Sequence, residues 1–88
     1  MTEEEQIQLR DTILAHVFPM VAAPTPRAIA SATAACVGAA AVVVALLPDE
    51  ARRSAVLQLV QFLPLAAEKR AREIRSGKFD RDLHRRRN

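Results

Sequence analysis

The side chains that could take part in catalysis or metal binding are few in this sequence, and they lie far apart. His16 and His84 are separated by most of the chain, and neither has cysteines or carboxylates at metal-ligand spacing. Ser31 and Thr33 lie in a run of small apolar residues with no histidine or lysine within local reach, so no activated nucleophile is indicated. We therefore expect a protein that is not an enzyme and that has no metal and no cofactor.

Cys36 is the one cysteine, and its neighbours are apolar and uncharged. Such a setting is typical of a small buried apolar residue rather than of a reactive thiol. A single cysteine cannot form an internal disulfide. The chain opens with TEEE instead of a positively charged segment, which indicates no cleavable signal peptide and predicts a cytoplasmic protein.

Positive charge is concentrated in the second half of the chain. Residues 1–47 carry two basic and four acidic side chains, a net of −2, whereas residues 48–88 carry eleven basic and six acidic ones, a net of +5. Arginine predominates there, and its planar guanidinium suits carboxylate or phosphate groups. We expect the following residues to bind a partner, either an acidic protein surface or the phosphates of a nucleic acid: Lys69, Arg70, Arg72, Arg75, Lys78, Arg81, Arg85, Arg86 and Arg87.

Acidic residues interrupt this basic segment, namely Glu68, Glu73, Asp80 and Asp82. The mixture favours a patterned protein interface over a pure phosphate-binding tail. Phe79 is the one aromatic residue of the segment, so any nucleic-acid binding is expected to rely on backbone phosphates and to show little sequence preference. The plain alternative is a solvated helix end followed by a soluble tail.

The elements that position these residues are expected to be helices. The chain contains no Trp or Tyr and only two Gly, and its Val and Ile residues fall in runs that are typical of helix rather than strand. We predict three helices, at about residues 3–18, 26–47 and 49–76. They form a single domain over residues 1–77, followed by a basic tail over residues 78–88.

Start and stop signals set the first two predicted helices. Thr2 and Glu5 have the spacing of a capping box, which satisfies backbone N–H groups at a helix start. Pro19 should end or bend the first helix because its ring clashes with the preceding turn. Thr25 followed by Pro26 is typical of an N-cap with proline at the first helical position.

The third predicted helix is the longest. Pro48 marks its start and Gly77 its end, while Pro64 in its middle should produce a kink. Phe79 and Leu83, four residues apart, hint at a short additional turn in the tail. The predicted fold is an all-α three-helix bundle or hairpin with a long kinked C-terminal helix, completed by oligomerisation or by a partner.

Residues 28–47 contain no charge, amide or aromatic side chain, which raises the question of a membrane span. As a helix they extend about 30 Å, the thickness of the hydrocarbon layer, and the basic C-terminal side would then lie in the cytoplasm. Thirteen of these twenty residues are Ala, Ser, Thr, Gly or Cys, however, so insertion would be marginal. We favour a helix that packs closely against neighbours, chiefly through Val37, Val43, Val44 and Leu47.

One chain supplies only two further helices, which is too little to cover such a segment. We therefore predict a small interaction protein, such as an assembly subunit, adaptor or inhibitor of a larger complex, that binds another copy or other proteins. An alternative is a small inner-membrane protein with a span at residues 28–47 and a basic cytoplasmic tail. A second alternative is a nucleic-acid-binding accessory protein.

Overall fold

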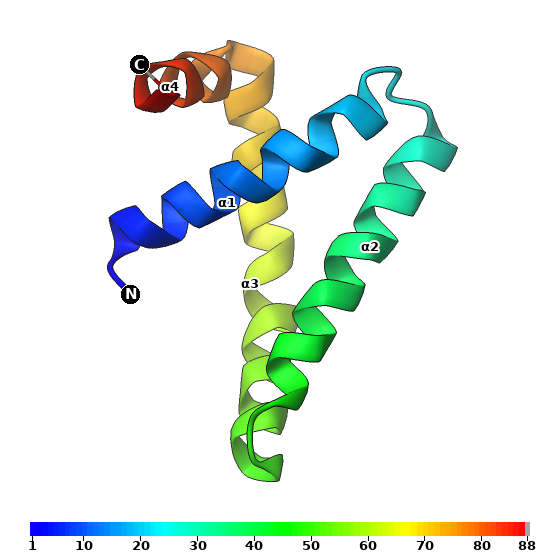
Figure 1. Ribbon diagram of the computed structural model, residues 1–88, viewed down its shortest axis with the longest axis vertical. Helices are drawn as coiled ribbons and strands as arrows, with labels where there is room; N and C mark the ends of the chain where they lie inside the picture. Colours follow the sequence, from blue (N-terminus) through cyan, green and yellow to red (C-terminus); the bar gives the residue numbers. More distant parts are fainter. Residues whose placement is uncertain (88) are drawn as a thin grey trace. The chain divides into compact units, whose positions relative to one another are not determined.

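The computed structural model describes residues 1–87, with the side chains of residues 1–85, and all regular elements of this described part are helical (Figure 1). The predicted all-α class is therefore confirmed. In chain order the elements are α1 (Glu3–Val17), the 3-10 helix η1 (Phe18–Val21), α2 (Pro26–Ala45), α3 (Asp49–Ser76) and α4 (Lys78–Arg87).

The start of α1 is the predicted capping box. The backbone N–H of Glu5 donates to Thr2 Oγ1 at 3.1 Å, and the backbone N–H of Thr2 donates to Glu5 Oε1 at 3.4 Å. Each bond satisfies a donor that the first turn of a helix leaves without an intrahelical partner. At the other end α1 stops at Val17, and the chain continues as η1, which contains Pro19.

Helix α2 also begins with a side-chain cap, and it ends earlier than predicted. Thr25 Oγ1 accepts from the backbone N–H of Ala28 at 3.1 Å. The helix ends at Ala45 rather than at Leu47, and the N–H of Leu47 donates to the carbonyl of Val44 at 3.0 Å in a turn. The physical reason is Pro48, since its ring disfavours the helical conformation of the residue before it.

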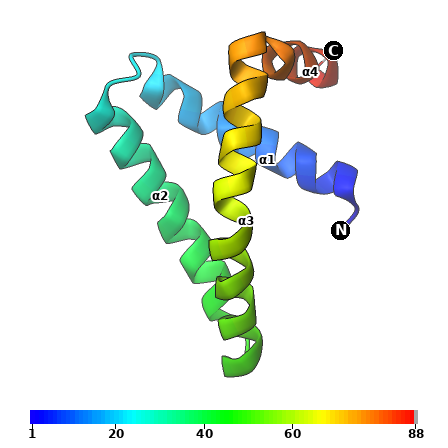
Figure 2. The same cartoon turned by 180° about the vertical axis from the view of Figure 1, so that it is seen from behind.

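Helix α3 is continuous from Asp49 to Ser76, with Pro64 inside it (Figure 2). Its first turn is closed by the N–H of Arg52, which donates to the carbonyl of Pro48 at 2.8 Å. Proline has no backbone N–H, so the bond that residue 64 would make to the carbonyl of Val60 is absent. The helical hydrogen bonds before and after Pro64 nevertheless keep α3 continuous at this position.

Residues 78–87 form α4, a fourth α-helix where the sequence had indicated a tail with at most a short turn. Gly77 makes the connection, because it has the left-handed φ of 79° that non-glycine residues avoid. Its N–H donates to the carbonyl of Ile74 at 3.2 Å, and its own carbonyl accepts from the N–H of Arg81 at 3.1 Å. Gly77 thus ends α3 and starts α4, and Figure 2 shows α4 turning away from the α3 axis at this corner.

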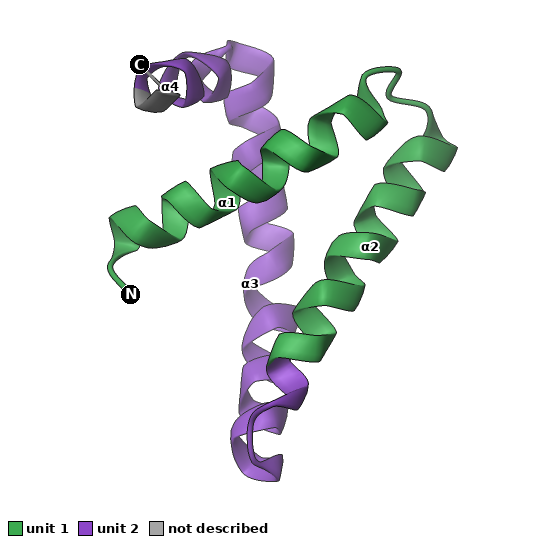
Figure 3. Ribbon diagram, viewed as in Figure 1, with its two compact units in different colours: residues 1–43 green, residues 44–88 purple. Residues whose placement is uncertain are grey.

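The chain divides into two units, residues 1–43 and residues 44 onward (Figure 3). The first contains α1, η1 and most of α2, and the second contains the end of α2 together with α3 and α4, which contact each other. Among the described side chains, the buried apolar ones are Ala32, at 5% exposed, and Leu83, at 9%. Among the described residues, almost no large apolar side chain is buried. Most of the large apolar side chains are exposed on the surface instead.

Candidate interaction surfaces

The apolar residues of α2 lie largely in contact with solvent. Of the four predicted packing residues, Val37, Val43 and Leu47 are exposed and Val44 is half-buried. Cys36 is exposed as well, so the expectation of a buried cysteine is wrong for the chain by itself.

Helix α2 is also the one helix of the described residues that is long and apolar enough to cross a membrane. Its most apolar 18-residue window has a mean hydropathy of 2.1, and 6% of that window is buried. The central helix of a soluble protein passes the same length and composition test, but its own chain normally covers most of it. The apolar surface of α2 is therefore not covered by the other elements of its own unit, α1 and η1.

The first half of α3 has a second exposed apolar surface. Val56, Leu59, Val60 and Leu63 recur at the i, i+3, i+4, i+7 spacing that places side chains on one side of a helix, and we call them the α3 apolar face. All four are exposed, with Val60 at 66% and Leu63 at 62%. By the same helical geometry Gln58 and Gln61 fall on the opposite side. The side with the two glutamines also carries the exposed Leu65, so the polar stripe of this segment is narrow.

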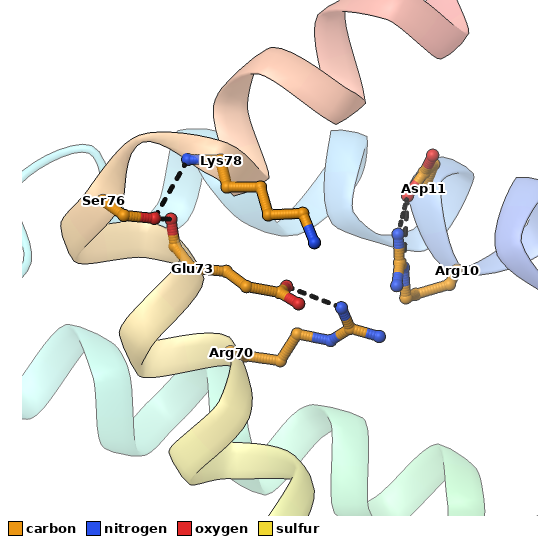
Figure 4. A network of polar contacts seen from close by, with 6 residues as sticks. All are labelled: Arg10, Asp11, Arg70, Glu73, Ser76 and Lys78. Carbon is orange, nitrogen blue, oxygen red and sulfur yellow. Dashed lines mark hydrogen bonds and ion pairs between the residues drawn. The ribbon is translucent and has the colours of Figure 1, made fainter.

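The basic residues predicted to bind a partner occupy the end of α3 and the whole of α4. Lys69, Arg70, Arg72 and Arg75 of α3 are all exposed. Arg70 donates from Nη1 to Glu73 Oε2 at 2.7 Å (Figure 4). That hydrogen bond, followed by the positive charges of Arg70, Lys78 and Lys69, holds the pKa of the Glu73 carboxyl below its ordinary value, although partial desolvation opposes the effect.

Figure 4 also shows how this end of α3 is closed. The Ser76 hydroxyl donates to the carbonyl of Glu73 at 3.1 Å and accepts from the backbone N–H of Lys78 at 3.4 Å. In α1, Arg10 forms an ion pair with the adjacent Asp11 at 2.9 Å. These contacts hold the charged side chains of each helix in defined local positions.

Helix α4 separates its apolar and basic residues onto opposite sides. Phe79 and Leu83 are four residues apart and share one side, where Leu83 is buried and Phe79 is half-buried. Lys78, Arg81 and Arg85 follow the i, i+3, i+7 spacing on the other side, and all three are exposed. The side chains of Arg86 and Arg87, also predicted partner-binding residues, lie outside the described residues.

Two features of these surfaces escaped the sequence reasoning. The first is the helical order of residues 78–87, for which the pair Phe79 and Leu83 after Gly77 was the available signal. The second is the charged first turn of α3, where Arg52 pairs with Asp49 at 2.8 Å. The i,i+3 spacing of Asp49 and Arg52 could have indicated that pair.

No group of three or more His, Cys, Asp or Glu side chains in the described part of the chain could hold a metal ion. A shallow depression of about 450 Å³ is lined by Asp80, Arg81, His84 and Arg85, all from α4. Because one helix supplies every lining residue, the depression is a feature of the α4 surface rather than an enclosed site.

Comparison with protein-family models, with curated proteins and with solved structures finds no match for this chain.

Proposed function

We propose that the protein acts by binding rather than by catalysis, as a small helical subunit, adaptor or inhibitor of a larger assembly in the cytoplasm. Its apolar helices complete a bundle with another copy or with other proteins. The kink that Pro64 favours in α3 lets that long helix follow the surface of such a bundle. The basic end of α3 and helix α4 dock onto an acidic partner.

The observation that carries this proposal is that two separate apolar segments are exposed, in α2 and in the first half of α3. A membrane span in α2 would account for the first segment only. The apolar part of α3 runs for 14 residues, Ser54 to Ala67, and a span needs about 20. A shared helical core accounts for both segments at once.

The charge pattern supports a protein partner for the basic surface. Asp80 is exposed beside Arg81, and Glu73 pairs with Arg70, so the surface alternates in sign instead of being uniformly positive. Such alternation matches a complementary protein surface, whereas a uniform phosphate backbone would meet repulsion at each carboxylate. The exposed arginines supply bidentate contacts to carboxylates of the partner.

The test is expression without detergent, followed by membrane fractionation and light scattering of the purified protein. A discrete oligomer, or a defined complex with other proteins, in the soluble fraction supports the proposal. Protein that pellets with membranes after a high-salt wash and is released only by detergent contradicts it. Val43→Asp should abolish assembly in either case, because it places an unpaired charge in a surface that must be covered.

The second candidate is a small inner-membrane protein in which α2 spans the bilayer and the basic C-terminal half lies in the cytoplasm. The hydropathy and low burial of α2 favour it, as does the basic charge that follows the helix. Here α3 would lie along the membrane interface. Carbonate-resistant membrane association, with an epitope at the C-terminus protected from protease outside the cell, would support this candidate over the first.

The nucleic-acid alternative has its own test. Binding of the protein to duplex DNA and to RNA is measured at two salt concentrations, for the parent and for the Arg85→Ser, Arg86→Ser, Arg87→Ser triple variant. Phosphate contacts predict an affinity that falls with salt and falls again in the variant. Absent or unchanged affinity removes this alternative.

A further inference from the structure

We draw no further inference here: the strongest candidate, the basic surface patch on the outer side of α4 formed by Lys78, Arg81 and Arg85, belongs to the interaction surface already described, and nothing in the structure shows what covers it.

Discussion

At the scale of single residues, the pair of Arg70 and Glu73 is the best-defined charge contact of the basic surface. Its donor and acceptor lie 2.7 Å apart on successive turns of α3. The pair lowers the pKa of Glu73 and occupies the guanidinium of Arg70, so the outward charge of this region comes mainly from Lys69, Arg72 and Arg75. Exposed pairs of this kind add little stability, and their effect here is on where charge is presented.

Arg70→Gln should raise the pKa of Glu73 toward its ordinary value, because the first cause of the lowering is the hydrogen bond from Arg70. Since the folded-state pKa is lowered, the pair stabilises the helix above the unfolded-state pKa. That contribution disappears as the pH falls through the folded-state pKa. A carboxyl NMR titration of both proteins checks this. Arg72→Gln is the control, since Arg72 is not among the causes of the shift, and the Glu73 titration curve should not move.

The two glycines predict opposite results for the same substitution. Gly77→Ala should destabilise the protein by about 1 kcal/mol or more, because alanine is strained at a φ of 79°. Gly38→Ala should stabilise α2 by about 0.5–1 kcal/mol, since nothing lies within 4 Å of an added Cβ and alanine favours helix. Urea unfolding of both variants measures the difference. A destabilising Gly38→Ala would reveal a neighbouring helix that approaches α2 closely at that point.

At the scale of the elements, local signals in the sequence located the helix starts well. The first turn of a helix leaves backbone N–H groups without a partner. Side chains accept from them at Thr2 and Thr25, and proline at residue 48 has no such N–H group. These effects act over three or four residues only. Local signals were weaker at the ends. Helix α2 ends at Ala45, two residues before the predicted end, because Pro48 disfavours the helical conformation of Leu47 and the last residues form a turn in which the Leu47 N–H donates to the Val44 carbonyl.

The order of α4 could not be predicted from propensity, because its arginine-rich sequence resembles a solvated tail. Its helicity depends on the burial of Leu83 and on the reversal at Gly77, and both are properties of the folded unit. The basic residues 78, 81 and 85 were therefore identified in the sequence as charges but not as one side of a helix. Exposure of the α3 apolar face was likewise beyond sequence reasoning, since an apolar stripe at helical spacing normally indicates a core.

At the scale of the whole molecule, a chain with almost no buried large side chains should depend on association for its stability. Folding and binding are then one equilibrium, and the melting temperature rises with protein concentration. Tenfold dilution of the parent should lower the melting temperature by several degrees. Val60→Glu, which places a carboxylate on the α3 apolar face, should show a lower melting temperature and a smaller change with dilution. Calorimetry or circular dichroism at several concentrations measures both.

The reactivity of the exposed Cys36 thiol can report whether α2 is covered by a partner or by lipid in the cell. It is the single cysteine of the chain and lies midway along the apolar helix α2. Alkylation by a small water-soluble reagent should be slow while any partner or lipid covers that side of the helix, and fast after denaturation. The fraction of protein that is alkylated in intact cells then measures the fraction of chains in which Cys36 is accessible to solvent. The measurement needs no tag and no substitution.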